Sequence, residues 1–481
     1  MGTVLQFRPQ DNRVEYSLAV AEASAALHRA VDVKLAGHGS FADREVALLD
    51  AANEACRMDL QAELQEIADA MPEKILVDGV LFSRHQDGSA SYHSLCGSLP
   101  SRRPTYRKVG ERNGTTIAPL ELVAGIVEGA TPALAYRVAL GYAQGPGRRA
   151  EEQMHADHRE PPSRSTLERM GKAIGTRVKA LAPRIEPMLR QEEELPAGAH
   201  AVAVGLDRTS VPMEEERPAG ATPSTRRKKR TKPYVRKPPP PVDVKYHMAY
   251  VGTVSVVDKE GESLITRRYA VSGEEDPQEI LPRMMADVRR GREQRRLRVG
   301  VLQDAAPEMW NLVRGALKQA GLRKWDEGVD RYHLNERLAD ILRLAGLSDG
   351  ERAQRFRLWN QDLDADDDAI DRIAKWLAGE IPRHHGDKLE KLEQHWTFLF
   401  NNNDRMRYAT LRRAGLPTGS GATEGACKSV VMIRAKGCGQ RWHEDGVNAA
   451  LTLRAVYMSE RLPTLWPHFA AEYIADVRAV A

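Results

Sequence analysis

Between residues 199 and 333, short apolar runs alternate with helical patterns, and this order limits the fold more than any other feature of the chain. Three runs have the length and β-branched content of strands: "HAVAVGLDRTSV", in which we place the strand end at Asp207, "YHMAYVGTVSVVD" and "SLITRRYAVSG". A helix with Pro277 near its first turn, the strand "LRVGVLQD", a helix closed by Gly321 and the strand "KWDEGVDRYHL" follow. The order β, β, β, α, β, α, β predicts an α/β domain with both parallel and antiparallel strands.

Residues 334–415 interrupt this alternation and predict a helical insertion. They contain several helical patterns with tryptophans at apolar positions and an acidic turn, "DLDADDDAID". After the insertion, residues 416–481 return to the α/β domain with a helix around Glu424 and the long helix "DGVNAALTLRAVYMSERL". We therefore expect one domain in two parts, separated by the insertion.

A basic block lies between the first and second of the expected strands. The net charge of the chain is only +4, but "TRRKKRTKPYVRK" carries eight Lys or Arg between Arg226 and Lys237, and four prolines follow it. Such a block cannot bury itself, so we expect residues 214–243 to form an extended or disordered arm. The arm would add non-specific, salt-sensitive affinity for DNA, and a solvated spacer is the alternative. Its candidate DNA-binding residues are Arg226, Arg227, Lys228, Lys229 and Arg230.

The N-terminal part of the chain is predicted to be mostly helical. Residues 1–70 have helical periodicity, and we interpret them as a packing or dimerisation helix pair. Residues 71–117 combine Gly and Asp turns with β-branched and aromatic clusters, which predicts a small β-rich segment.

Residues 118–198 are predicted to be a helical, DNA-binding region. A Gly-Pro-Gly break separates two helical patterns, and Ser163 is a plausible N-cap for a third, which contains Arg164, Arg169 and Lys172. A helix, a turn and a helix rich in Ser and Arg are typical of a helix-turn-helix DNA reader. An ordinary helical bundle with a polar face is the alternative.

Cysteine usage and hydropathy exclude several classes of protein. The four cysteines have neither metal-ligand spacing nor the pattern of a disulfide framework. No apolar run approaches the roughly 20 residues that a membrane span needs, and the N-terminus lacks the apolar segment of a signal peptide. We expect a soluble protein of the cytoplasm without a membrane partner.

Three acidic residues, Asp207, Asp304 and Glu424, are the candidate catalytic residues, and each also has an ordinary interpretation. Asp304 follows a strand and precedes a helix, as an N-cap residue does. Asp207, at the expected strand end, has the position of a turn residue. Glu424 lies four residues before Lys428, and such a helix pair stabilises by only a few tenths of a kcal/mol.

Together, the three acids suggest a metal site. If the strands of Asp207 and Asp304 are parallel neighbours, their ends lie about 4.8 Å apart. Two carboxylates at that distance repel unless a cation lies between them, and a pair of Mg²⁺ ions needs oxygen ligands of this kind. Glu424, in the first turn of a helix and among small residues, would complete the second ion's ligands.

Four pieces of the chain match a known family: "VGLDRTSVPM", "VLQDAAPEMW", "DRYHLNERL" and "GSGATEGACKSVVMIRAKGCGQRW". Over roughly residues 200–460, the chain resembles DDE transposases of bacterial insertion sequences, most closely the ISKra group, which is related to Mutator-like transposases. The resemblance implies a ribonuclease-H-like mixed sheet with a helical insertion. It also implies a catalytic and metal-binding triad of Asp207, Asp304 and Glu424 that holds two Mg²⁺ or Mn²⁺ ions.

The resemblance extends to further residues and to partners. Asp330 and His333 match a D-x-x-H element near the active site, and a strand-end cap with a hydrogen-bonded core histidine is the alternative. Arg441 and Trp442 match a downstream RW element, for which core packing is as plausible as DNA contact.

The implied partners are the terminal inverted repeats, target DNA and a second copy of the chain in a homodimer or higher oligomer at the nucleoid. Further candidates for holding the DNA backbone are Lys428, Arg434 and Lys436.

The implied reaction is metal-dependent DNA strand cleavage at an element end, followed by transfer of the free 3′-OH to target DNA. Two other functions remain open from the sequence. One is a domesticated, transposase-derived DNA-binding regulator without catalysis. The other is a ribonuclease-H-like nuclease that cleaves without joining.

Overall fold

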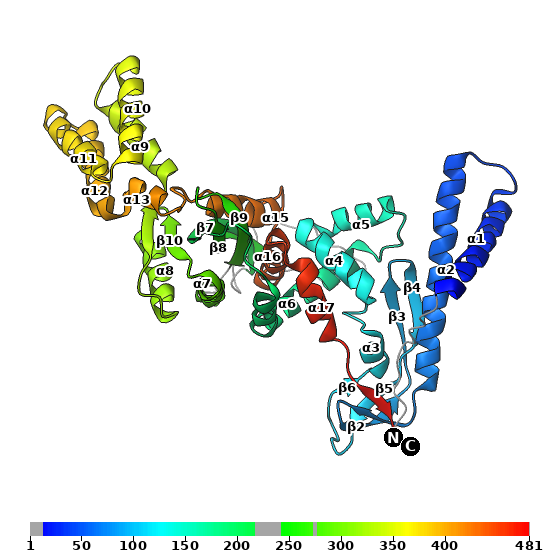
Figure 1. Ribbon diagram of the computed structural model, residues 1–481. Helices are drawn as coiled ribbons and strands as arrows, with labels where there is room; N and C mark the ends of the chain where they lie inside the picture. The colour runs from blue at the N-terminus through cyan, green and yellow to red at the C-terminus, as the bar shows by residue number, and fades with distance from the viewer. Residues whose placement is uncertain (1–12, 217–241, 273–276, 481) are drawn as a thin grey trace, which may run out of the picture. The chain divides into compact units, whose positions relative to one another are not determined.

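The computed structural model describes residues 13–216, 242–272 and 277–480 of the 481-residue chain. The chain forms two compact units (Figure 1). The first unit contains residues 1–186 and 461–481, and the second contains residues 187–460. The basic part of the expected arm, residues 217–241, lies outside the described residues.

The first unit begins with a helical hairpin, as the sequence predicts for residues 1–70. Its helices are α1 (Arg13–Leu35) and α2 (Phe41–Ala70). Ser40 caps α2 with a capping box, in which its hydroxyl accepts from the Asp43 N–H and the Asp43 carboxylate accepts from the Ser40 N–H. The reciprocal bonds explain why α2 begins here.

The β-rich segment of the first unit follows α2. Its strands are β1 (Lys74–Val77), β2 (Val80–Gln86), β3 (Ser89–Ser94), β4 (Gly97–Arg102), β5 (Thr105–Lys108) and β6 (Thr116–Ile117). The five-stranded sheet has the order β12-β1-β2-β5-β6, and β3 and β4 form a separate hairpin. The helices that follow are α3 (Pro119–Ala124), α4 (Pro132–Gln144), α5 (Gly147–Ala156) and α6 (Arg164–Glu192).

The unit boundaries differ from the predicted domains at two places. Residues 461–481 belong to the first unit, because β12 (Val477–Ala479) pairs with β1 and α17 (Leu462–Ala471) packs on α4. At the other boundary, α6 runs from the first unit into the second, which begins at Pro187. The first difference arises from a pairing between segments far apart in the chain, for which the local sequence has no signal.

The second unit is built on a five-stranded mixed sheet, in agreement with the predicted α/β class. Its strands are β7 (Ala201–Glu216), β8 (Val242–Val257), β9 (Ser263–Ser272), β10 (Arg298–Gln303) and β11 (Asp326–Val329). Their order across the sheet is β11-β10-β7-β8-β9. The pairs of β10 with β7 and with β11 are parallel, whereas β7, β8 and β9 run antiparallel to one another.

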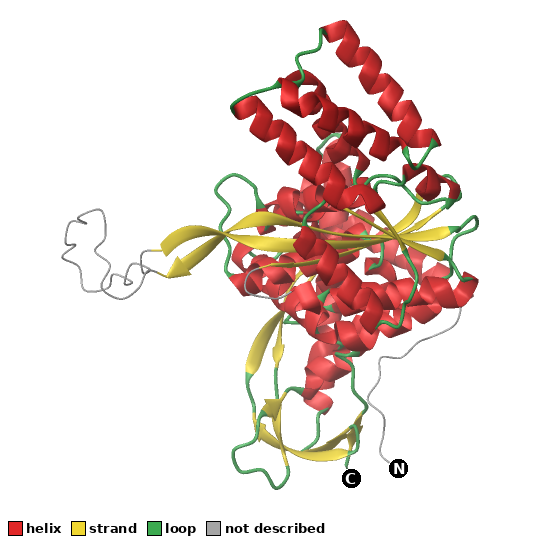
Figure 2. Ribbon diagram, turned by 90° about the vertical axis from the view of Figure 1, so that its left-hand side faces the viewer, coloured by secondary structure: helices red, strands yellow, loops and turns green. Residues whose placement is uncertain are grey.

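Strand β7 does not end at Asp207 as the sequence suggested. It continues to Glu216, and β8 is the only named strand that pairs with its far half, from Asp207 opposite Val251 to Glu216 opposite Val242. Figure 2 shows this two-stranded ribbon extending beyond the rest of the sheet. Pro212 and the glutamates after it have low strand propensity, so the sequence did not predict that the strand continues to Glu216.

Helices cover both faces of this sheet. The even-numbered residues of β7, such as Val204 and Leu206, share a buried cluster with Met284 and Trp310. These come from α7 (Leu281–Arg295) and α8 (Pro307–Gln319), and the short η1 (Pro277–Glu279) precedes α7. The opposite face is covered by α14 (Gly421–Ala426), the π-helix η4 (Cys427–Met432), α15 (Ile433–Ala435) and α16 (Glu444–Met458).

The helical insertion lies between β11 and α14. Its elements are α9 (Arg331–Leu344), α10 (Asp349–Ala365), α11 (Ala369–Glu380), η2 (Ile381–Arg383), α12 (Asp387–Asn402), η3 (Asn403–Arg405) and α13 (Tyr408–Arg413). Figure 1 shows α9 to α12 grouped side by side at one end of this unit. Their apolar residues, including Trp359, share one cluster with the core under the sheet, so the insertion is anchored to the sheet.

No helix in the described part of the chain is both long and apolar enough to cross a membrane.

Candidate functional site

The pairing of β10 with β7 brings Asp304 level with Asp207. The two strands are parallel, with Val301 opposite Val204. Three residues further along each strand lead to Asp304, directly after β10, and to Asp207, within β7. The condition on which the metal-site hypothesis depends, that the two strands are parallel neighbours, therefore holds.

Glu424 reaches the same place because α14 lies directly on the sheet. Buried Thr423 of this helix bonds to Thr253 of β8, with 2.7 Å between the hydroxyl oxygens. The helix crosses β7 at Gly205, where a Cβ would overlap the Thr423 Oγ1 atom. Glycine is therefore required at this point, because any side chain would push α14 away from the sheet.

The three acids line one pocket with a volume of about 260 Å³. Glu424 lies in the first turn of α14, as predicted, and its side chain is 32% exposed. Asp304 is exposed and Asp207 is half-buried. The other side chains that line the pocket include Arg208, Thr209, Gln303, His333, Ser420, Thr423, Cys427, Lys428 and Met432.

The hydrogen bonds of the two aspartates leave their negative charges unbalanced. Asp304 accepts a bond from the N–H of Ala305 at 2.6 Å, and Asp207 accepts one from the N–H of Arg208 at 2.7 Å. The second Asp207 oxygen accepts from the thiol of Cys427 at 3.4 Å. Within the described residues, neither aspartate forms an ion pair, and the Arg208 guanidinium pairs instead with Glu308 at 2.9 Å. Two carboxylates that line one pocket without an ion-pair partner are a donor set that fits divalent cations with oxygen ligands, although their ligand atoms and that of Glu424 do not form a group within 4.8 Å of one another.

The structure excludes the ordinary interpretations of Asp304 and Asp207 and supports that of Glu424 in part. Asp304 is not an N-cap, since Ala306 occupies that position of α8 and makes no side-chain cap bond. Asp207 is not a turn residue, because it lies within β7. Glu424 does pair with Lys428 at 3.6 Å, but this pair is on the surface and contributes little stability.

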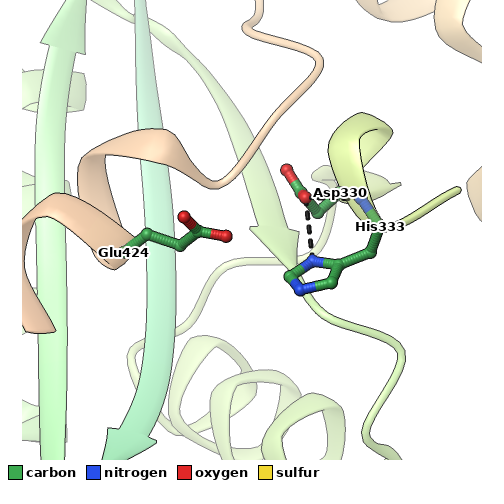
Figure 3. A group of neighbouring side chains, drawn as sticks. All are labelled: Asp330, His333 and Glu424. Atoms are coloured by element: carbon green, nitrogen blue, oxygen red, sulfur yellow. Dashed lines mark hydrogen bonds and ion pairs between the residues drawn. The ribbon is translucent and has the colours of Figure 1, made fainter. Parts of the chain in front are cut away.

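Asp330 and His333 lie beside Glu424, but not on a strand as the sequence suggested. Asp330 is the N-cap of α9, and His333 lies in the first turn of that helix. Figure 3 shows the Glu424 carboxylate facing this pair. Possible ligand atoms of Asp330, His333 and Glu424 all lie within 4.8 Å of one another, and among the described residues only this group of three is so compact.

The contacts of Asp330 indicate a structural role: it acts as a brace, meaning that its carboxylate holds the starts of two helices together. It is 2% exposed. One oxygen accepts the N–H of Ser420, the N-cap of α14, at 2.6 Å. The other accepts the N–H of His333 at 3.1 Å and lies 2.9 Å from the His333 Nδ1 atom. Asp330 thus joins the start of α9 to the start of α14 and orients the His333 ring, while His333 itself lines the pocket.

We expect Asp330→Ala to loosen both helix starts. The substitution leaves two backbone N–H groups without their acceptor, which costs about 1–3 kcal/mol for each buried group left unpaired. Hydrogen exchange should accelerate at the amides of Ser420 and His333, and the melting temperature should fall. Asp349→Ala is the matched control, because that aspartate is 93% exposed at the start of another helix. Unchanged exchange at both amides would show that Asp330 is not a brace.

The predicted cations after Glu424 have different environments. Lys428 is 68% exposed beside the pocket, where a phosphate can reach it. Lys436 donates to the Thr209 hydroxyl at 2.8 Å, close to Asp207 on the same strand. Arg434 differs from the prediction, because it is 2% exposed and stacks 4.8 Å from the centre of the Trp442 ring. A buried guanidinium held over an aromatic ring packs the protein and does not present itself to a DNA backbone.

The RW element packs against the β7 ribbon. Trp442 donates its indole N–H to the Ala435 carbonyl at 3.0 Å, and its backbone bridges to β7 at Met213. Arg441 is 53% exposed and lies 3.8 Å from Glu214. Trp442 therefore fits the core-packing interpretation of the RW element, whereas Arg441 stays a candidate for DNA contact.

The other candidate DNA-binding residues belong to the first unit or lie outside the described residues. Arg164 and Arg169 are exposed on α6 of the first unit, and Lys172 is half-buried there. Three consecutive helices, α4 to α6, occupy the region predicted to resemble a helix-turn-helix. The five basic residues from Arg226 to Arg230 lie outside the described residues.

Sequence reasoning missed two residues that shape the pocket, Cys427 and Gly205. Cys427 lies three residues after Glu424, which is helical spacing and was a usable signal. Burial and the neighbouring carboxylate of Asp207 raise the pKa of the Cys427 thiol, so the sulfur stays protonated. Gly205 gave no signal by itself, because its importance depends on which helix crosses it.

The chain matches no protein-family model, and no curated protein matches its sequence. Its function therefore has to be inferred from the site.

Proposed function

We propose that this protein is a DDE transposase of an insertion sequence, which cuts DNA at the element ends and joins them to target DNA. The observation that carries the proposal is the convergence of Asp207, Asp304 and Glu424 on one pocket from two parallel strands and a helix far apart in the chain. The mixed sheet with a helical insertion ahead of Glu424 supports the ribonuclease-H-like fold that this function implies.

The charge pattern of the pocket supports phosphoryl transfer. Asp207 and Asp304 would hold one divalent cation between them, and Glu424 would share a second. Mg²⁺ or Mn²⁺ bound there would stabilise the charge that develops on the attacking and leaving oxygens. His333, oriented by Asp330, and exposed Lys428 border the pocket where the scissile phosphate would lie.

The proposed reaction has two steps in the same pocket. In the first, a water oxygen loses a proton and bonds to the phosphorus at the element end, the bond from phosphorus to the 3′ oxygen breaks, and that oxygen takes up a proton and leaves as a 3′-OH. In the second, this 3′-OH loses its proton and bonds to a target phosphorus, and the displaced 3′ oxygen of the target strand takes up a proton. Neither step needs a covalent enzyme intermediate, so the residues of the pocket only bind, orient and balance charge.

The test uses the full chain, the DNA that flanks its coding region and a supercoiled plasmid. With Mg²⁺, we expect nicks at a defined position in the flanking DNA and its covalent insertion into the plasmid. Chelation by EDTA should stop both reactions. Nicking without insertion would favour a nuclease, and binding without nicking would favour a DNA-binding regulator.

We expect the first unit to contribute DNA affinity through α6. If exposed Arg164 and Arg169 each contact a phosphate, replacing both by Ala should weaken binding and reduce the slope of log K against log salt by about 2. Arg478→Ala, at an arginine 52% exposed on β12 of the same unit, is the control. The same slope in the double variant and the control would show that α6 does not bind phosphates.

A further inference from the structure

Cys427 occupies an unusual position between two of the acids. It begins the π-helix η4, three residues after Glu424, and is 6% exposed. Its thiol lines the pocket and donates to the Asp207 Oδ2 atom at 3.4 Å. Single π-helical turns within helices frequently occur at functional sites. The thiol therefore links the helix of one acid to the strand of another.

The bond from Cys427 completes a two-point restraint on the Asp207 carboxylate. One oxygen of Asp207 accepts the backbone N–H of Arg208 at 2.7 Å, and the other accepts the thiol. Two donors on different oxygens limit the rotation of the carboxylate plane. Asp304, by contrast, accepts one hydrogen bond from the residues that the structure describes, from the adjacent N–H of Ala305. Asp207 is thus the restrained partner of the pair.

A protonated thiol suits this task. The S–H donates to Asp207 and, as a donor, adds no further negative charge to a pocket that already has three acids. A hydroxyl in the same place would also donate. An apolar side chain would fill the space without donating.

We propose that Cys427 is a positioning residue, whose thiol holds the Asp207 carboxylate in the orientation that binds divalent cations together with Asp304. This inference rests on the proposed function only in taking the two aspartates as cation ligands. Partners of metal ligands that act in this way typically change metal affinity 10- to 100-fold when they are replaced.

A packing role is the competing explanation, because Cys427 also belongs to an apolar cluster with Val211, Val251 and Val430. The two explanations make opposite predictions about which substitution at Cys427 is tolerated. If the thiol positions Asp207, Cys427→Ser keeps the donor and is tolerated, whereas Cys427→Val loses it. If Cys427 only packs, Val is tolerated and buried Ser destabilises.

The experiment measures Mn²⁺ binding to the full chain without DNA, by electron paramagnetic resonance of the free ion. We expect Cys427→Ser to bind Mn²⁺ within about twofold of wild type, and Cys427→Val to bind about tenfold more weakly. Cys427→Ala, which also lacks a donor but cannot overpack, should resemble Val, and melting curves should show that all variants are folded. Cys438→Val is the control at an exposed cysteine.

Two results would overturn this inference but leave the proposed function intact. One is wild-type Mn²⁺ affinity in both Cys427→Val and Cys427→Ala, and the other is an equal loss of Mn²⁺ affinity in Cys427→Ser and Cys427→Val. Asp207→Asn distinguishes these from a failure of the proposed function. If wild type binds no Mn²⁺, or binds it no better than Asp207→Asn, then both the inference and the metal site fail.

Discussion

Replacing Asp207 or Asp304 by Asn, or Glu424 by Gln, should reduce Mg²⁺-dependent strand cleavage by at least about a hundredfold. Each amide keeps the shape of the side chain but removes the charge that would hold a cation in the pocket. Binding of DNA should persist, since removing a negative charge lowers repulsion of the phosphates. Gel electrophoresis of end-labelled DNA measures cleavage, and fluorescence anisotropy measures binding.

Two matched substitutions outside the pocket are the controls. Glu390→Gln changes an exposed glutamate that, like Glu424, lies in the first turn of a helix, and Asp349→Asn changes an exposed aspartate of the insertion. Both should cleave like wild type. Wild-type cleavage by any of the three pocket variants would remove that residue from the proposed triad, and wild-type cleavage by all three would end the transposase assignment.

Gly205→Ala should disable the site without touching a charged group. The new Cβ would overlap Thr423 Oγ1 and approach the Leu302 carbonyl to 3.1 Å. Thr423 cannot swing away easily, because it is β-branched, buried and bonded to Thr253. The helix of Glu424 must therefore shift, and we expect a loss of about 1–3 kcal/mol in stability with a large loss of cleavage.

The cause of the Gly205 effect can be isolated by a second substitution. Thr423→Ala removes the atom that collides, so Gly205→Ala and Thr423→Ala together should cost less than the sum of the two single changes. Gly315→Ala is the control, since a Cβ there meets nothing within 4 Å. Additive losses, or a Gly205→Ala protein as active and stable as wild type, would mean that α14 does not depend on close contact at β7.

The order of strands and helices in the second unit was predictable, because each element carries its own pattern. The order alone did not decide that the strands of Asp207 and Asp304 are neighbours, because β8 and β9 lie between them in the chain; their parallel pairing is a finding of the structure. The helical insertion was predictable because its segments carry patterns of their own, with Trp359 buried where its apolar position suggested. Local periodicity therefore predicted the secondary-structure elements that surround the site.

Features that depend on contacts between distant segments were not predictable. Strand β12 belongs to the first unit through its pairing with β1, almost the whole chain away. Arg434 was expected to face DNA, yet it is buried against Trp442, because a charged residue's sequence position does not reveal an aromatic partner. The bond from Cys427 to Asp207 likewise joins residues 220 positions apart.

Anomalous scattering from Mn²⁺, in crystals of the protein with its flanking DNA, tests most directly whether the three acids form one metal-holding site. We predict a peak between the carboxylates of Asp207 and Asp304, and a second peak that touches Glu424. Mn²⁺ held by Asp330, His333 and Glu424, with no peak at the two aspartates, would contradict the account.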